Sequence, residues 1–321
     1  MIKVFTDIQK AQKDWKKIQV PDFLNINFLK VYFQKHSQLK HLFFVDDDMR
    51  LYAHIFNLTF SRAVNYLQNS LFANIFLRLI NFNVLYLTNS FITNIPSFIT
   101  NQSINLKKLL NTIEEDYSVI VIPDFLFNRM SNKEDDYKKI EVEEEMVLDI
   151  RNNWHVLEDY ILDLRKKYRN KVKKIIKETS KVEIRNLDSE QLENLYIEMQ
   201  DLFDQVVKSS SFAGPEFDIS SFILFVKQDL MKVSGYFLDN KLIAFSSEIN
   251  DTKILYSYYV GFDKKLNNSL PIYGRILIEN ITNAIQSKKD KLILDRTANE
   301  YKSNFGAYPI KSYIYLKVRN K

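Results

Sequence analysis

The stretch KILYSYYVGFDKKLNNSLPIYGRILIENITNAIQSKKDKLILD (253–295) carries the strongest fold signal in the chain. KILYSYYVGF (253–262) is rich in aromatic and β-branched residues and predicts a strand. SLPIYGRILIENITNAIQSKK (269–289) has the apolar spacing of a helix, with Ser269 as its expected N-cap and a proline near its first turn. KLILD (291–295) predicts another strand. A strand, a helix and a strand in this order predict a βαβ unit with two parallel strands.

Strand patterns also flank this unit. VSGYFLD (233–239) and KLIAFSSEI (241–249) meet at Asp239-Asn240, which is a tight hairpin signal. IKSYIYLKV (310–318) predicts the last strand of the chain. These strands surround the βαβ unit with antiparallel neighbours, so the sheet is expected to be mixed and mostly antiparallel.

Helical patterns precede these strands. Residues 189–207 repeat apolar side chains at helical spacing, with Ser189 as the expected N-cap. DISSFILFVKQDLM (218–231) looks like a second helix. With a short strand at 181–187, the second half has the order β-α-α-β-β-β-α-β-α-β. This order predicts the α/β (α+β) class, with helices on both faces of the sheet.

The first half reads as a degraded copy of this order, which predicts a duplicated fold. All five glycines lie at or after Gly214, so the first copy lacks the glycines of the second. The expected organisation is a degenerate domain at 1–150, a linking helix at 151–180 and a C-terminal domain at 181–321 that holds the functional site. A chain of 321 residues suits two domains of roughly 150 residues.

The expected link is one long amphipathic helix. Apolar residues recur at three- and four-residue spacing from Leu157 to Ile176. The segment RKKYRNKVKKIIK (165–177) holds eight basic residues and no acidic one. A solvated helix face explains this charge, and contact with tRNA or with an anionic membrane surface is the alternative.

Composition excludes several functional classes. The chain has no cysteine, which rules out disulfides, thiolate metal sites and a cysteine nucleophile. The four histidines are scattered without metal-binding spacing, so no metal is expected. No apolar signal region follows Met1, and the apolar segment 71–87 is interrupted by Arg78 and falls short of the ~20 residues of a membrane span. A soluble, cytoplasmic protein without a transmembrane segment is therefore expected.

A family resemblance rests on three sets of residues. Trp154, Tyr160 and Lys167-Tyr168-Arg169 form the pattern W-x5-Y-x6-KYR, and YVGFD is followed by PIYGRIL. The third is RTANEYKSNFGAYP (296–309). With the element order, these residues resemble the GNAT acyltransferase superfamily, and within it FemAB-like tandem GNAT proteins and uncharacterised acyltransferases of Bacteroidetes-type bacteria. The resemblance covers most of the chain and is strongest over 152–309.

This resemblance implies a donor site. In the GNAT fold the pantetheine of the donor lies between two parallel strands that splay apart, and a backbone N–H polarises its thioester. Tyr259, Val260 and Gly261 are the candidates here, unless Gly261 merely ends a strand. Phosphates would meet the helix N-terminus near Ser269, where unpaired N–H groups favour anions, close to the residues Gly274 and Arg275. An ordinary capped helix is the alternative.

The chain departs from the usual GNAT phosphate loop. The pattern Q/R-x-x-G-x-G/A is absent, and KKLNNSLPIYGR stands in its place with a single glycine. FemAB-type relatives also lack the pattern, and some of them use aminoacyl-tRNA as donor. The donor therefore stays open between acyl-CoA and aminoacyl-tRNA.

Acyl transfer to an amine also needs a base and an acid. Glu248 and Asp263 are the candidate bases, and burial in a cleft raises a carboxyl pKa toward a useful value. Along its strand Glu248 shares a face with Ser246. The resemblance suggests Tyr301 as the general acid that protonates the departing thiolate. A solvated strand-end carboxylate and a core aromatic are the alternatives.

The segment after the last strand of the βαβ unit supplies the remaining candidates. Arg296 and Lys302 are expected to bind an anionic group of the substrate, since ligands bind at the carboxyl ends of strands in open α/β sheets. Thr297 and Glu300 fit a capping box, and Gly306 fits a helix C′ position with positive φ.

The expected function is N-acyl transfer from an acyl-CoA, acetyl-CoA or a longer one, to a primary amine of a small-molecule, lipid or peptide acceptor. One alternative is an aminoacyl-tRNA-dependent transferase that acts on a peptidoglycan precursor. The other is a non-catalytic GNAT-fold binding protein.

Overall fold

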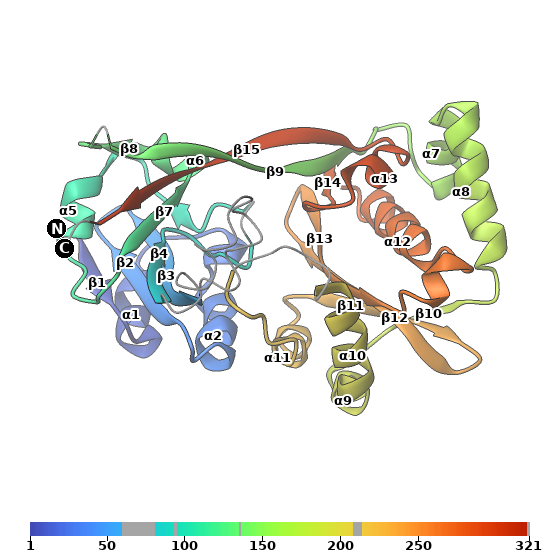
Figure 1. Cartoon of the computed structure of the whole chain (residues 1–321), viewed down its shortest axis with the longest axis horizontal. Helices are drawn as coiled ribbons and strands as arrows, with labels where there is room; N and C mark the ends of the chain where they lie inside the picture. Colours follow the sequence, from blue (N-terminus) through green and yellow to red (C-terminus); the bar gives the residue numbers. More distant parts are fainter. Residues whose placement is uncertain (60–80, 93–94, 135, 208–213, 320–321) are drawn as a thin grey trace, which may run out of the picture. The chain divides into compact units, whose positions relative to one another are not determined.

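The computed structural model describes residues 1–59, 81–92, 95–134, 136–207 and 214–319, which divide into two compact units. Unit 1 comprises Met1–Val142, Ser211–Asp218 and Ser312–Lys321, and unit 2 comprises Glu143–Ser210 and Ile219–Lys311. Figure 1 shows the elements of both. The sequence placed the boundaries after residues 150 and 180. In the structure, two segments from the second half of the chain, Ser211–Asp218 and Ser312–Lys321, belong to unit 1.

The sheet of unit 2 is mixed. Its strands follow the order β10-β11-β12-β13-β14-β9. β13 and β14 pair in parallel, and the other neighbours in this order pair antiparallel. The hairpin between β11 and β12 turns at Asp239 and Asn240, both with positive φ, as the sequence predicts. The bounds are β9 Lys138–Asp149, β10 Glu183–Asn186, β11 Lys232–Leu238, β12 Lys241–Asn250, β13 Ile254–Phe262 and β14 Lys291–Ile293.

Helices cover both faces of this sheet (Figure 1). α12 packs on β12, β13 and β14, with α7 and α8 behind it, whereas α10 packs on β12 and β13 and α11 on β11. The predicted α/β class, with a mixed and mostly antiparallel sheet between helices, is confirmed. The bounds are α7 Leu157–Asp163, α8 Lys166–Glu178, α9 Ser189–Asn194, α10 Tyr196–Val207, α11 Ser221–Lys227, α12 Ile272–Gln286 and α13 Asn299–Ser303.

Two expected helices are each divided in two. The helix predicted at 189–207 forms α9 and α10, and its N-cap is Asp188 rather than Ser189. The linking helix breaks at Leu164, whose backbone is extended. Arg169 stabilises this break, because its Nη2 donates to the carbonyls of Leu162 at 2.8 Å and Leu164 at 3.0 Å. A periodic apolar stripe does not reveal such a break, since it continues in phase across it.

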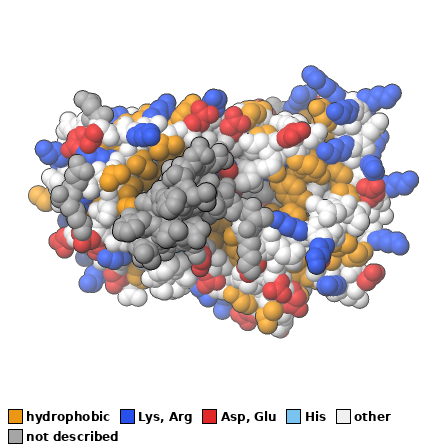
Figure 2. Space-filling view, in the orientation of Figure 1, with side chains coloured by type: hydrophobic (Ala, Val, Ile, Leu, Met, Phe, Trp, Pro, Cys, Tyr) orange, Lys and Arg blue, Asp and Glu red, His pale blue; other side chains and the backbone are white. Residues whose placement is uncertain are grey.

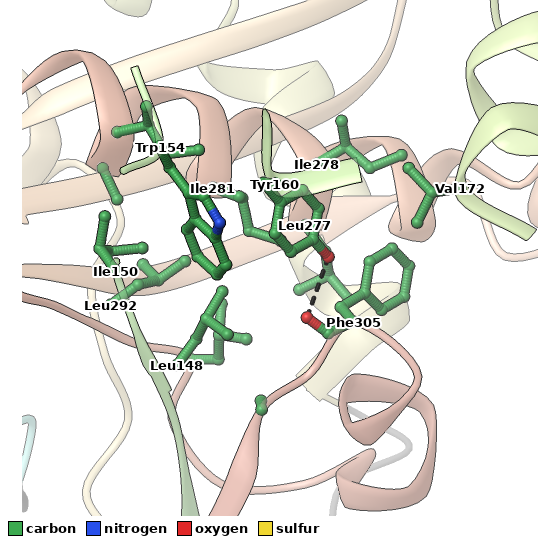
Figure 3. Close-up of a cluster of buried hydrophobic side chains, with 14 of the residues drawn as sticks. Leu148, Ile150, Trp154, Tyr160, Val172, Leu277, Ile278, Ile281, Leu292 and Phe305 are labelled. Atoms are coloured by element: carbon green, nitrogen blue, oxygen red, sulfur yellow. Dashed lines mark hydrogen bonds between the residues drawn. The ribbon is translucent and has the colours of Figure 1, made fainter. Parts of the chain in front are cut away.

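The tryptophan and tyrosine of the W-x5-Y pattern belong to the core of unit 2 (Figure 3). Trp154 Nε1 donates to Asp163 Oδ2 at 2.6 Å, and the fully buried Tyr160 hydroxyl donates to the Phe305 carbonyl at 2.9 Å. Buried Tyr and Trp need such partners for their polar ends. Tyr160 therefore joins α7 to the segment after α13, whereas Trp154 bonds to the last residue of α7. Gly306, in the segment after α13, has the predicted positive φ, +86°.

The sheet of unit 1 repeats the topology of unit 2. Its order is β1-β2-β3-β4-β7-β15. Again the fourth and fifth strands, β4 and β7, pair in parallel and the others antiparallel. The two sheets thus share one strand order and one position for the parallel pair. The bounds are β1 Lys3–Phe5, β2 Lys40–Val45, β3 Arg50–Thr59, β4 Asn81–Tyr86, β7 Val119–Pro123 and β15 Tyr308–Val318.

Short elements complete unit 1. α1 packs on β2 and on α2, and β5 pairs with the edge of β3. β6 and β8 form a separate two-stranded sheet. The bounds are α1 Ile8–Trp15, α2 Ile26–Lys35, α5 Leu106–Leu110, α6 Asp124–Phe127, β5 Phe98–Ile99, β6 Ile104–Asn105 and β8 Met130–Ser131.

Among the helices that the structure describes, none is long and apolar enough to cross a membrane. Residues 71–80 of the apolar segment 71–87 lie outside the described residues.

Candidate functional site

The parallel strands β13 and β14 separate at their carboxyl ends. Their pairing ends at Tyr256 and Ile293, where β14 stops. β13 continues beyond this pair to Phe262. The carboxyl ends of parallel strands are where ligands of open α/β sheets bind.

A β-bulge marks β13 at this splay. The register between β12 and β13 shifts between Ser246 and Glu248. Two β13 residues, Tyr258 and Tyr259, therefore stand opposite Ser247. The Ser247 hydroxyl donates to the Tyr259 carbonyl at 2.8 Å and so holds the bulge. Bulges occur next to active sites because they redirect the backbone locally.

Val260 and Gly261 follow the bulge and are set by packing. The Val260 side chain packs against a small core cluster that includes residues of α12. Gly261 faces α10: a Cβ there would lie 2.8 Å from the Phe203 amide nitrogen and 2.9 Å from the Leu202 carbonyl carbon. Gly261 does not end the strand, and its lack of a side chain lets the α10 backbone approach β13.

The first turn of α12 uses its own chain to satisfy its N–H groups. Ser269 was predicted as the N-cap, but this is wrong: the helix begins at Ile272, and the Ser269 hydroxyl donates to the Leu266 carbonyl at 3.1 Å. The Tyr273 amide donates to Asn267 Oδ1 at 2.9 Å. A proline at the N-cap also removes one donor. This turn is therefore less open to anions than the sequence suggested.

Arg275 is engaged on the helix. Its guanidinium lies 3.5 Å from the Glu279 carboxylate, one turn further along, and both side chains are about one-fifth exposed. This pair directs the Arg275 charge along α12 rather than beyond its N-terminus.

Tyr301 meets Gly274 in the first turn of α12. A Cβ on Gly274 would lie 2.6 Å from the Tyr301 hydroxyl, so the glycine makes room for it. The Tyr301 ring packs at 5.6 Å from Tyr273, and the Lys171 ammonium lies 4.4 Å from its centroid. Tyr273 in turn packs at 5.4 Å from Phe262, the last residue of β13. This row of rings connects Tyr301 to the end of β13. Burial raises the pKa of Tyr301.

The loop after β14 has an unusual backbone. Asp295, Thr297 and Ala298 all have positive φ, between 51° and 70°. The N-cap of α13 is Ala298, without a side-chain hydrogen bond, so the predicted capping box of Thr297 and Glu300 is wrong. Positive φ is costly for a β-branched residue such as Thr297, and strain of this kind clusters at functional sites.

Lys302 fixes the backbone of this loop. Its ammonium donates to the carbonyls of Asp295 at 3.1 Å and Arg296 at 2.8 Å, and its side chain is 2% exposed. Burial lowers the pKa of Lys302 to about 8, while the negative charge of Asp295 opposes this shift. A lysine so placed stabilises the loop and is not directed toward a ligand.

Two polar atoms beside this loop lack partners. Arg296 Nε and Asn299 Oδ1 are buried, and neither has a hydrogen-bond partner within the described part of the chain. Arg296 therefore keeps donor capacity at the carboxyl end of β14. Buried polar groups without partners are rare in native proteins, so each one calls for an explanation, such as a functional role.

Glu248 is buried under α12 and is not a solvated carboxylate. Its side chain is 3% exposed. Oε1 accepts from Asn280 at 2.7 Å, and both oxygens accept from Asn283 at 3.0 and 3.1 Å. Burial raises the pKa of Glu248, although both amides oppose the shift. The Ser257 hydroxyl donates to Asn280 Oδ1 at 3.2 Å, so this network reaches the first β13 residue beyond the splay.

Asp263 has a structural partner. Its Oδ1 accepts from the Leu266 amide at 2.9 Å, and its own amide donates to the Ile243 carbonyl at 3.0 Å. This geometry caps the turn that follows β13.

The structure thus brings the Tyr301–Gly274 contact and the Arg296 loop to the carboxyl ends of β13 and β14, while Glu248 connects to this place through Ser257. The sequence reading missed Asn280 and Asn283. The signal was present, because both amides lie on the apolar face of a predicted helix, where a polar side chain requires a partner.

Comparison with known proteins identifies the fold. No protein-family model matches the sequence, and no curated protein matches it. Among solved structures, L-PGS from Bacillus licheniformis matches with a TM-score of 0.55 and 10% identity, over 95% of this chain and 94% of that chain. FemX matches with a TM-score of 0.52 and 10% identity, over 98% and 96%. A C-terminal domain assigned to lysylphosphatidylglycerol synthetase from Agrobacterium fabrum matches with 0.53 and 9%, over 96% and 90%.

At such low identity these similarities show a shared fold and nothing about the reaction. They extend over nearly the whole chain, both units included. The mixed sheets between helices, the parallel strand pair in each unit and these neighbours together support a GNAT-like fold.

Proposed function

We propose that the chain is an N-acyltransferase that moves an acyl group from an acyl-CoA thioester to a primary amine. The observation that supports this most directly is the splay of β13 from β14 beyond Tyr256, with a bulge at Tyr258 and Tyr259. In this proposal the pantetheine lies in the splay. The thioester carbonyl then accepts from a β13 backbone N–H at Tyr259, Val260 or Gly261, which stabilises the tetrahedral oxyanion.

Tyr301 is the proposed general acid. Its pKa is raised by burial, so the hydroxyl stays protonated at neutral pH. Its hydroxyl adjoins Gly274 in the first turn of α12, and the Tyr273 ring links it to Phe262 at the end of β13. When the tetrahedral intermediate breaks down, the C–S bond is lost and Tyr301 gives its proton to the thiolate.

The two carboxylates have different proposed parts. Glu248 is too enclosed to touch the amine, and it acts by orienting Asn280 and so Ser257 at the splay. A base is still required to take a proton from the amine nitrogen that attacks the thioester, and Asp263 is the remaining sequence candidate. One of its oxygens accepts from the Leu266 amide.

Arg296 is the proposed contact for an anionic group of the substrate. It lies at the carboxyl end of β14, and its Nε lacks a partner in the structure. Lys302 positions it by fixing the carbonyls of the loop. This assignment replaces the expectation that both cations bind the substrate directly.

A second donor, aminoacyl-tRNA, is favoured by the position of α8. Its exposed lysines include Lys166, Lys167, Lys173 and Lys174. Blue side chains project where α8 lies, at the upper right of Figure 2. Lys171 on the same helix contacts the Tyr301 ring, so the basic face adjoins the proposed site. A polyanionic donor would gain from this charge.

The first test is a thermal melt of the full chain with CoA, acetyl-CoA and a long-chain acyl-CoA. A ligand at about 100 times its dissociation constant stabilises by roughly 2.7 kcal/mol. We expect one of them to raise the melting temperature, and the Arg296→Ala variant to lose part of the rise. A salt-sensitive shift with tRNA and none with any CoA compound would replace the acyl-CoA donor by aminoacyl-tRNA. No response to either donor would favour a non-catalytic binding protein.

A further inference from the structure

Unit 1 contains a hydrogen-bonded chain of buried histidines that the proposed reaction does not use. His36, His41 and His54 are at most 4% exposed. Burial lowers the pKa of His36 and of His41 to about 4 and lowers that of His54 well below its ordinary value. All three rings are therefore neutral at neutral pH, and each has one N–H donor and one bare nitrogen.

The direction of every bond in this chain follows from its ends. His41 Nε2 lies 3.1 Å from the His36 carbonyl, which can only accept, so Nε2 carries the proton. His41 Nδ1 then accepts from the Tyr52 hydroxyl at 2.8 Å. The Tyr52 oxygen accepts from His54 Nδ1 at 3.3 Å, and His54 Nε2 accepts from the Ser90 hydroxyl at 2.7 Å. Each donor from Ser90 to His41 thus has an acceptor.

Three polar groups next to this chain have no hydrogen-bond partner among the residues that the structure describes. They are His36 Nδ1, Thr88 Oγ1 and Asn89 Nδ2, and all three residues are 0% exposed. The Asp218 amide donates to His36 Nε2 at 3.1 Å, so the His36 proton is on Nδ1. The Phe91 amide donates to Asn89 Oδ1 at 3.0 Å, which fixes the unpartnered amide nitrogen as a donor. All three groups can therefore donate a hydrogen bond.

His36 and the segment that carries Asn89 meet at the Phe91 ring. The Phe91 ring lies 4.4 Å from His36 and 5.9 Å from His54 between ring centroids. Ser90, between Asn89 and Phe91 in the sequence, bonds to His54. Native proteins rarely leave several buried donors without hydrogen-bond partners.

The position of these donors in unit 1 matches the proposed site in unit 2. Thr88 and Asn89 directly follow β4, which pairs in parallel with β7 as β13 does with β14. The backbone of Leu87 still bonds to Val121 of β7. Both places are the carboxyl ends of the parallel pair in a repeated fold, where ligands of open α/β sheets bind.

We propose that His36, Thr88 and Asn89 form a second ligand site, in unit 1, for a small molecule that presents a neutral carbonyl oxygen, such as a carboxamide. An sp² oxygen has two lone pairs and accepts from two or three converging donors. The donors are uncharged, so they satisfy a neutral oxygen. A carboxylate would be buried with its charge unbalanced, which is costly. This site is independent of the acyl transfer proposed for unit 2.

The test uses the full chain with ¹⁵N-labelled histidine, which gives few signals because the chain has four histidines. Acetamide and sodium acetate are titrated separately, and the His36 Nδ1 resonance is followed. We expect a saturable shift with acetamide and none with acetate. Thr88→Val keeps the shape of the side chain and removes the hydroxyl, and it should weaken the acetamide response about tenfold.

Thr179→Val is the matched control. Thr179 is 1% exposed in unit 2, and its hydroxyl already donates to the Ile175 carbonyl at 2.8 Å, so the response to acetamide should be unchanged. Asn89→Asp is the second variant, since it keeps the acceptor for the Phe91 amide and loses the donor. A response to acetate alone would overturn the neutral-carbonyl assignment. No saturable shift, or equal responses in Thr88→Val and Thr179→Val, would overturn the site.

Discussion

The hydroxyl of Tyr301 stands 2.6 Å from the place that a Cβ on Gly274 would occupy. The other close neighbour of that place is Ile175 Cδ1, at 2.8 Å. Both atoms are the far ends of side chains, which can turn aside. Gly274→Ala also gains roughly 1 kcal/mol of helix propensity. We expect this variant to keep the unfolding free energy within about 1 kcal/mol of the parent, while acyl transfer falls because Tyr301 moves.

Gly261→Ala should behave in the opposite way. Its added Cβ would lie 2.3 Å from Phe245 Cε1 and within 3 Å of two α10 backbone atoms, from Leu202 and Phe203. Backbone atoms cannot rotate away as a side chain can, so α10 must shift away from the sheet. We expect the free energy of unfolding to fall by about 1–3 kcal/mol or more. Urea unfolding of both variants measures the contrast. Equal losses of stability would show that α10 yields as easily as the Tyr301 side chain.

Tyr301→Phe tests the proposed acid directly. Removing a general acid lowers kcat by about 10²–10⁴-fold. Once a donor and an amine acceptor are found, we expect kcat to fall by at least a hundredfold in that range, with little change in the melting temperature. Tyr273→Phe is the control, because this neighbouring ring packs on Tyr301 and loses only its own hydroxyl. If both variants lost activity equally, the loss could not be assigned to proton transfer from Tyr301.

Much of the fold could be predicted from the sequence, because the strand and helix patterns around β13, α12 and β14 are strong and local. The duplication was also visible, since element order survives where residue identity does not. The break at Leu164 could not be predicted. It is stabilised by the bonds from Arg169 to two backbone carbonyls, and these bonds depend on how α7 and α8 lie in the folded chain. A periodic pattern records which residues face the core and not where the backbone turns.

The candidate site was predicted less well than the fold. Thr297 and Glu300 fit a capping box by spacing, yet the backbone around Thr297 is left-handed. Lys302, whose place after the strand at 291–295 suggested a substrate contact, donates to two loop carbonyls. Glu248 was a candidate base with a solvated carboxylate as the alternative, and the amides that surround it come from α12, about thirty residues away. Side-chain roles set by long-range contacts are not encoded in local spacing.

Lys302 predicts a specific pH dependence. Its folded pKa of about 8 lies below the ordinary lysine value of 10.5. The unfolded chain therefore binds more protons between these values, and stability rises with pH across that window. Relative to Lys302→Met, the parent should gain up to roughly 3 kcal/mol between pH 8 and 10.5 and show no slope from this group below pH 8.

The measurement is urea unfolding in a Trp15→Phe background, where Trp154 of unit 2 is the remaining tryptophan. Other alkaline titrations occur in both proteins and cancel in the difference. A difference that stays constant across the window would mean that Lys302 is not buried as a charged group.

The buried histidines predict acid sensitivity in unit 1. His36 and His41 have a folded pKa of about 4, below the ordinary value of 6.5, so between these values the unfolded chain binds the extra protons. Stability is then lost as pH falls from 6.5 toward 4, by roughly 2 kcal/mol per histidine at pH 5.

His41→Gln keeps a donor and an acceptor and cannot titrate. In a Trp154→Phe background, Trp15 reports unit 1, where it is buried. The stability difference between parent and His41→Gln should shrink by that amount from pH 7.5 to pH 5, because carboxylates titrate alike in both. A difference independent of pH would mean that His41 reaches water in the folded state.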